Sequence, residues 1–124
     1  MSLRRIGCGT SGGTTAGWAP GSVYACDMGG IVHCIDVQTG EVLWRNRNAG
    51  GGTWSTLTQT GDGLLYLLTK SGTTTVFRAD RGKFRPIAEN GLDEPSNASV
   101  VVAGGEVFIR TDAALWCFAG PAAV

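Results

Sequence analysis

Side chains that could perform chemistry are few in this sequence, and their spacing completes no catalytic or metal-binding pattern. The chain has one histidine, His33, and four cysteines that form no C-x-x-C pair: Cys8, Cys26, Cys34 and Cys117. A structural zinc site draws four ligands from closely spaced cysteines and histidines, so a metal site is not expected. Free cysteine commonly behaves as a small buried hydrophobe, and we predict structural thiols, with a disulfide as the alternative.

Patterns typical of nucleophilic or phosphate chemistry are also incomplete. His33 lies inside a predicted strand, where a structural role is favoured over that of a catalytic base. The segment GCGTSGG at residues 7–13 has the glycines of a phosphate-binding loop but lacks its lysine, and no G-x-S-x-G motif occurs. Asp27, Glu89 and Asp112 lie in or near predicted turns, as solvated carboxylates commonly do. We therefore expect no catalytic residues and no cofactor.

Charge and hydrophobicity exclude further classes. Ten basic residues balance ten acidic ones, whereas a protein that follows nucleic-acid phosphates normally carries a basic excess. No apolar stretch approaches the length of a membrane span, and no secretory signal follows the arginines near Met1. A cytosolic protein, or one whose signal lies upstream of this sequence, fits these features. The 20 glycines indicate many tight turns between short strands.

The chain repeats itself with a period of 42 residues. The pairs Val23-Tyr24, Leu65-Tyr66 and Val107-Phe108 are each separated by 42 positions, and each follows a turn-like segment. Gly30 and Gly72 keep the same offset, while the third unit has one residue fewer in the hairpin that follows. Such self-similarity indicates a repeat architecture.

Each unit has β-strand character, because short β-branched and aromatic runs alternate with glycine-containing turns. Strands are predicted at residues 23–26, 31–37 and 41–45, at 55–60, 64–69, 73–79 and 83–88, and at 98–102, 107–111 and 115–119. Four short strands in about 40 to 45 residues are typical of a propeller blade. We therefore predict an all-β fold: a single partial β-propeller domain over residues 1–124, an arc of about three four-stranded antiparallel blades. The expected blades cover about 9–48 and 52–90, with an incomplete third over about 96–119.

The segment CIDVQTGEVLW at residues 34–44 resembles the docking motif of the pyrroloquinoline-quinone-like (PQQ-like) β-propeller repeat family, and the chain resembles the C-terminal blades of a larger bacterial propeller protein. The resemblance implies that Trp44 wedges against the next blade and donates its indole N–H to a backbone group. The turn that aims it would contain Asp36, Thr39 and Gly40.

The second unit departs from this motif. Arg78 stands for the Asp, Arg81 for the Thr and Pro86 for the Trp. Because proline lacks the N–H of a central strand, Pro86 is predicted at a sheet edge or strand end. Docking of this unit would then use another contact, such as Phe84.

The resemblance implies a non-enzymatic binding or scaffold module, periplasmic or secreted, with an unknown ligand. A fragment of a PQQ-dependent dehydrogenase, with PQQ and calcium as cofactors, is the alternative. Rim loops would make the contacts, and the candidates are Trp18, Trp54, Arg110 and Asp112. No nucleic acid or membrane span is expected.

Three blades do not close a ring, since propellers usually have about four to eight. The expected partners are therefore further blades, a partner protein, or a second copy that completes the ring. Residues 2–8 are predicted to complete a blade, within one chain or between two.

Overall fold

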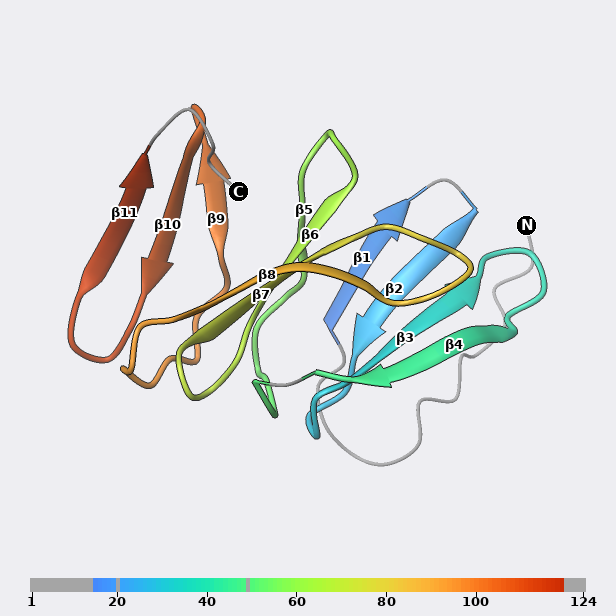
Figure 1. Ribbon diagram of the computed structural model, residues 1–124, viewed down its shortest axis with the longest axis horizontal. Coiled ribbons are helices and arrows are strands. Elements are labelled where there is room, and N and C mark those ends of the chain that lie inside the picture. Colours follow the sequence, from blue (N-terminus) through green and yellow to red (C-terminus); the bar gives the residue numbers. More distant parts are fainter. Residues whose placement is uncertain (1–14, 20, 49, 120–124) are drawn as a thin grey trace.

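Three antiparallel sheets follow one another along the chain in the computed structural model, which describes residues 15–19, 21–48 and 50–119 (Figure 1). The first contains β1 (Thr15–Ala19), β2 (Ser22–Cys26), β3 (Ile31–Asp36) and β4 (Val42–Arg47). The second contains β5 (Thr58–Gln59), β6 (Leu64–Leu68), β7 (Thr73–Arg78) and β8 (Arg85–Gly91), and the third β9 (Val101–Ala103), β10 (Glu106–Arg110) and β11 (Leu115–Ala119). These residues contain no helix, hence none able to cross a membrane. The all-β prediction is confirmed.

Within each sheet, consecutive strands are neighbours, in the orders β1-β2-β3-β4, β5-β6-β7-β8 and β9-β10-β11. This simple up-and-down order is what a blade requires. The third sheet has three strands in the described part of the chain, so it lacks the counterpart of β4 and β8 there. Three sheets side by side give the predicted arc. The proposed strand at residues 2–8 lies outside the described residues.

The inner strands of the second and third sheets are shorter than predicted, and side-chain hydrogen bonds explain why. The inner strand of the first sheet, β1, was not predicted. A strand was expected over residues 55–60, but β5 covers only Thr58–Gln59. Upstream, the hydroxyls of Thr53 and Ser55 both donate to the Leu68 carbonyl, at 2.6 and 2.7 Å. In the third unit Ser96 donates in the same way to the Arg110 carbonyl at 2.5 Å. Because these carbonyls already accept hydrogen bonds from side chains, the backbone hydrogen bonds of the inner strand begin further along the chain.

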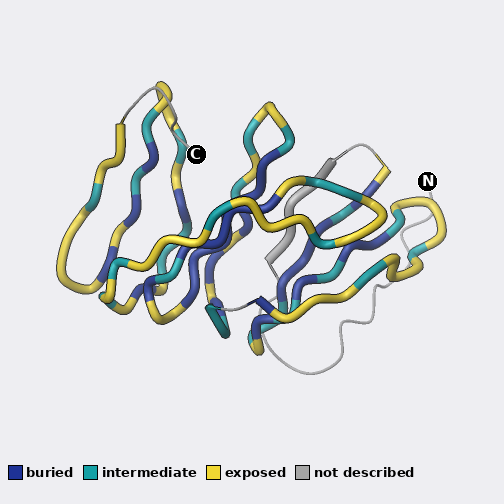
Figure 2. Tube along the Cα trace, in the orientation of Figure 1, coloured by how far each residue is buried: buried dark blue, intermediate teal, exposed yellow. Residues whose placement is uncertain are grey.

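The middle sheet is buried on both faces, as Figure 2 shows for its central strands. Every residue of β6 is buried. Leu65 and Leu67 belong to the apolar cluster shared with the first sheet, whereas Leu64, Tyr66 and Leu68 belong to the cluster shared with the third. Alternating residues of a strand point to opposite faces, and therefore a strand between two neighbours is apolar throughout.

Gly30 and Gly72 occupy equivalent hairpin turns, at φ of +92° and +87°, which side chains rarely adopt. The N–H of Gly72 donates to the Thr69 carbonyl at 3.0 Å, and Gly30 makes the equivalent bond to Asp27. A Cβ on Gly72 would overlap the Glu94 carbonyl, where the connection to the next sheet passes the turn. The repeated glycine thus joins each turn to the connection leaving its sheet.

We expect Gly72→Ala to destabilise the fold by about 3 kcal/mol or more, because backbone strain and a backbone clash add. Gly63→Ala is the matched control, since Gly63 has φ of +82° but open space around its Cβ position. It should cost only the strain, about 1 kcal/mol. Urea unfolding of both variants measures the difference. Equal losses would show that the close approach at Gly72 is unimportant.

Candidate binding rim and the contacts that position it

Trp44 joins the first sheet to the second. Its indole N–H donates to the carbonyl of Asp80 at 2.8 Å, and Asp80 lies in the β7–β8 connection of the second sheet. The ring centroid of Trp44 lies 6.0 Å from that of Tyr24 and 5.7 Å from that of Phe84. Phe77 completes the group, 5.2 Å from Phe84 and 6.2 Å from Tyr24. We call these four side chains the aromatic cluster; tilted rings at these distances attract beyond their burial.

The turn before Trp44 is organised by Asp36. One carboxylate oxygen of Asp36 accepts from the backbone N–H of Gln38 at 2.8 Å and of Thr39 at 2.9 Å. Gly40 adopts φ of +73° and donates its N–H to the Asp36 carbonyl at 2.9 Å, and the Thr39 hydroxyl accepts from the N–H of Glu41. Such aspartate-capped turns are pre-shaped by the side chain, and this one fixes where β4 begins.

Arg81 clamps the second sheet onto the first. Its guanidinium donates to the other oxygen of Asp36 at 2.5 Å, to the Ser22 hydroxyl at 2.8 Å and to the Gly21 carbonyl. The hydrogen bond from Arg81, followed by those from the turn, lowers the pKa of Asp36 to about 2. From the sequence, Arg81 was noted only as a departure from the docking motif. Its contacts with the first sheet could not be predicted, because the groups it binds lie about 45 to 60 positions earlier in the chain.

The structure corrects the alignment of the two outer hairpins. Cys34 pairs with Trp44 in the first sheet, and its equivalent Val76 pairs with Ala88 in the second. Ala88, not Pro86, therefore takes the place of Trp44, because the second hairpin is two residues longer. Pro86 lies in the edge strand β8, as its missing N–H predicted. Phe84 packs back against the first sheet and so does not dock the second sheet to the third.

The third sheet is held by different chemistry. The Glu94 carboxylate accepts from the Thr111 hydroxyl at 2.5 Å and from the indole N–H of Trp116 at 3.0 Å. The bond from Thr111, then that from Trp116, lowers the pKa of Glu94. On the inner side, the Thr58 hydroxyl donates to the Val100 carbonyl at 2.5 Å. No motif signals these contacts, because Glu94 has no counterpart in the first junction.

One rim of the arc carries an exposed tryptophan. Trp54 is 50% exposed, and the ammonium nitrogen of Lys70 lies 4.6 Å from its ring centroid. An ammonium over an indole face is attracted to it and fixes the ring. The N–H of Ser96 donates to the Lys70 carbonyl, and the N–H of Asp112 to the Pro95 carbonyl, at 3.0 and 2.9 Å. The connection at 95–96 therefore places Asp112 on the same rim, which we call the Trp54 rim.

The remaining rim candidates divide between the two ends of the strands. Arg110 is exposed and ends β10 beside Asp112, on the Trp54 rim. Trp18 pairs with Val23 at the end of β1 nearest the β1–β2 turn, whereas Trp54 precedes β5. Trp18 and Trp54 therefore lie at opposite ends of the inner strands of their sheets. Lys70, which sequence reasoning missed, belongs to the rim instead.

The cysteines take two environments. Cys26 and Cys34 are free thiols buried between the first and second sheets, and burial raises the pKa of Cys26 to about 12. For these two the structural interpretation is confirmed. Cys117 is exposed, with its thiol 3.5 Å from a Glu106 carboxylate oxygen, so the prediction of a buried thiol is wrong there. It pairs with Phe108 on the face of the third sheet that no described sheet covers, and Cys8 lies outside the described residues.

His33 lies 3.5 Å from Asp27, from its Nε2 to a carboxylate oxygen, and is largely buried. Asp27 also accepts from the N–H of Ile31 at 3.0 Å, within the β2–β3 turn. In the described ranges, no three histidine, cysteine, aspartate or glutamate side chains gather closely enough to hold a metal ion. The pair thus belongs to a turn and forms no multi-ligand site.

Trp44→Ala should lower the free energy of unfolding by about 3 kcal/mol, because it removes a partly buried ring from the aromatic cluster and leaves the Asp80 carbonyl without its donor. Leu43→Ala, at the neighbouring half-exposed position, is the control and should cost under about 1 kcal/mol. Urea unfolding followed by circular dichroism compares them. Similar losses would mean that Trp44 does not hold the two sheets together.

The contribution of the Asp36–Arg81 contact to the free energy of unfolding should depend on pH. Because the pKa of Asp36 is lowered to about 2, the contact contributes fully above the ordinary value near 4. Its contribution should disappear as the pH falls from about 4 through 2. The difference in unfolding free energy between the parent and Asp36→Asn, measured from pH 6 to 2, should therefore shrink toward acid. A constant difference would contradict the linkage.

A sequence model of the family described as outer membrane protein assembly factor BamB matches the chain over residues 7–84 and again over 27–120. Among solved structures, BamB from Moraxella catarrhalis superimposes with a TM-score of 0.69 at 12% identity, covering 83% of this chain and 32% of that one. The β-propeller domain of Cps50 (Swd1) from Myceliophteria thermophila gives 0.57 at 15% identity, covering 87% and 43%. No curated protein matches the chain.

At these identities the structural matches show the fold: the three sheets are blades of a β-propeller. This chain spans about a third of the length of the BamB chain and less than half of the Swd1 chain. The two overlapping sequence matches cover residues 7–120, nearly the whole chain, in keeping with the 42-residue repeat. The chain therefore belongs to the family described as outer membrane protein assembly factor BamB, with repeats of the PQQ-like β-propeller type.

Proposed function

We propose that this chain is a non-enzymatic, protein-binding part of a β-propeller and that the Trp54 rim makes the contact. The observation that carries the proposal is the half-exposed Trp54 ring under the Lys70 ammonium. Tryptophan is enriched among the residues that dominate protein interfaces, and a ring already fixed loses little entropy on binding. Arg110 and Asp112 add both signs of charge to the same rim, which suits a protein surface better than a polyanion.

The family supports the same conclusion. Its description names an outer membrane protein assembly factor, and we carry that role to this chain as a proposal: a scaffold that acts outside the cytoplasm, in the periplasm or beyond it. The arc described here is only part of a ring, and its partners on the propeller itself are further blades, in the same polypeptide or in a second copy.

The alternative, a fragment of a PQQ-dependent dehydrogenase, fits the described residues poorly. The resemblance implies a quinone held against a cysteine pair, with calcium bound by Glu, Asn and Asp. Cys26 and Cys34 instead lie within the apolar cluster between two sheets, and Cys117 lies on another sheet. No acidic cluster with metal-ligand geometry occurs in the described part of the chain.

A photo-crosslinking amino acid at position 54 should give a discrete crosslinked species in an extract of the source cells. The same amino acid at position 87 is the matched control, since Ile87 is 47% exposed but lies on the outer strand β8. Equal products from both positions would overturn the rim as the binding surface.

A titration with PQQ and calcium tests the alternative function. A ligand that binds only the folded chain raises its melting temperature by mass action. We expect no rise at saturating PQQ with excess calcium. A dose-dependent rise would favour the dehydrogenase fragment.

A further inference from the structure

The Trp54 rim is built twice, once in the second sheet and once in the third. The hydroxyls of Thr53 and Ser96 each donate to the carbonyl of a residue at the C-terminal end of a central strand, β6 or β10. Each hydroxyl also accepts from the backbone N–H two residues further on, at 2.9 and 3.1 Å. Trp54 and Asn97 follow these residues directly, and both are exposed. Asn97 therefore occupies in the third sheet the place that Trp54 has in the second.

Lys70 and Asp112 are equivalent in the same way. They lie 42 positions apart (112 − 70), in the turns that follow β6 and β10. Each donates its backbone N–H, at 2.9 Å, to the carbonyl two residues before the exposed residue of its sheet, Trp54 or Asn97. Since the Lys70 ammonium lies over Trp54, the equivalent pair in the third sheet is Asp112 with Asn97.

A single peptide group joins these two parts of the rim. The Pro95 carbonyl accepts from the N–H of Asp112 at 2.9 Å, and the N–H on the other side of that peptide bond, from Ser96, donates to the Lys70 carbonyl at 3.0 Å. Only one peptide group and two hydrogen bonds therefore separate the backbones of Lys70 and Asp112. Two side chains of opposite charge leave the rim at neighbouring points.

The polar groups of these side chains are not used within the described part of the chain. Lys70 and Asp112 are exposed, and there Asp112 forms no ion pair with Lys70 or with Arg110. The Lys70 ammonium is turned toward Trp54 instead. The Asn97 amide likewise makes no hydrogen bond with a described residue. The rim thus offers a cation beside an aromatic ring and, next to it, a carboxylate beside an amide.

We propose that the Trp54 rim recognises an extended segment of its protein partner in which an acidic and a basic residue are two positions apart. The acidic side chain binds Lys70, with its apolar part against Trp54, and the basic side chain binds Asp112. Side chains two positions apart in an extended chain point to the same side and lie about 7 Å apart, a spacing suited to neighbouring points of this rim. The inference rests on the proposed function and specifies the chemistry of the partner.

Complementary charges across an interface act mainly on specificity and on the rate of association. The test is therefore a selection. A library of random heptapeptides displayed on phage is selected on the full chain, after depletion on the Trp54→Ala variant. The retained peptides should carry an acidic and a basic residue two positions apart, in one fixed order. Selection on the double variant Lys70→Glu with Asp112→Lys should give the opposite order.

One selected peptide, made synthetically with a fluorescent label, measures the effect of each charge. Lys70→Glu should weaken its binding at least fivefold, because attraction is replaced by repulsion, and the loss should shrink in high salt. Lys83→Glu is the matched control, since Lys83 is also exposed but lies in the β7–β8 connection, at the other end of β7. It should leave binding unchanged.

The outcomes separate this inference from the function on which it rests. Failure to obtain any peptide that depends on Trp54 would contradict both the rim as a binding surface and the inference. Peptides that depend on Trp54 but lack the paired charges would overturn the inference alone. So would an order of charges that stays the same in the double variant, or equal effects of Lys70→Glu and Lys83→Glu.

Discussion

Every sheet of this fold depends on a neighbouring sheet to cover its apolar face. β6 shows the constraint most directly, since all five of its residues are buried and they contribute alternately to the two clusters on either side. A strand of this kind cannot be stable in a sheet that has water on one face. Stability therefore resides in the junctions between sheets, as in other repeat proteins whose modules contact only their neighbours. The rim that we assign to binding rests on connections that cross those junctions, so its geometry is set by the same packing.

The backbone of each junction repeats while the side chains diverge. In the connection that leaves the first sheet, the Gly52 carbonyl accepts a hydrogen bond from the N–H of Lys70. In the next connection, the Pro95 carbonyl accepts one from the N–H of Asp112. In contrast, one junction is closed by Trp44 and by the Arg81 ion pair, and the other by the Glu94 carboxylate. Backbone hydrogen bonds therefore preserve the register between sheets. Each junction is then free to change its side chains, provided that the apolar faces remain covered.

Sequence reasoning reached the features that are local and periodic. The 42-residue spacing, the turn glycines and the strands on either side of them depend on neighbouring residues, and all of these could be predicted. The equivalent of Trp44 could not, because two extra residues in the outer hairpin move Ala88 into its register while Gly82 keeps the expected offset. Arg81 and Glu94 act on groups brought close only by folding. The inner strands were predicted too long because hydroxyls of Thr53 and Ser55 occupy a carbonyl that a ladder would otherwise use.

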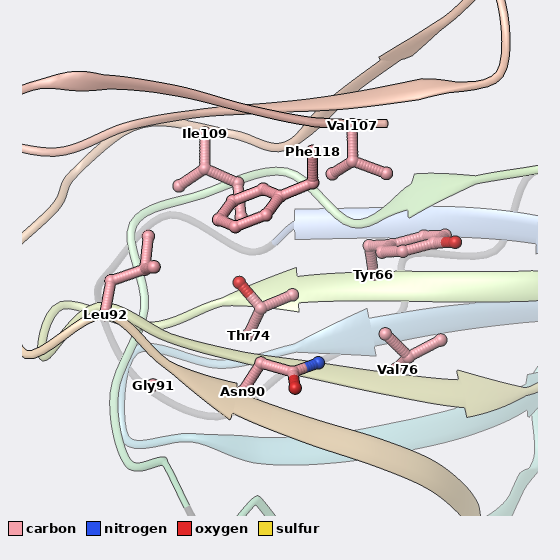
Figure 3. A pocket seen from close by; sticks show the side chains of 9 residues that line it. All are labelled: Tyr66, Thr74, Val76, Asn90, Gly91, Leu92, Val107, Ile109 and Phe118. Carbon is pink, nitrogen blue, oxygen red and sulfur yellow. The ribbon is translucent and has the colours of Figure 1, made fainter. Parts of the chain in front are cut away.

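The side chains available for binding are those that the packing between sheets does not use. Trp44 is committed to the packing between sheets, and its indole N–H already has a partner. Trp54 has a comparable ring but contacts Lys70 at the rim, where half of its surface remains open to another molecule. The second junction has Ala88 where the first has a tryptophan, and a cavity of about 360 Å³ lies between the second and third sheets (Figure 3). Since function resides in sites carried by a fold and not in the fold itself, these departures from the repeat are where a partner can be recognised.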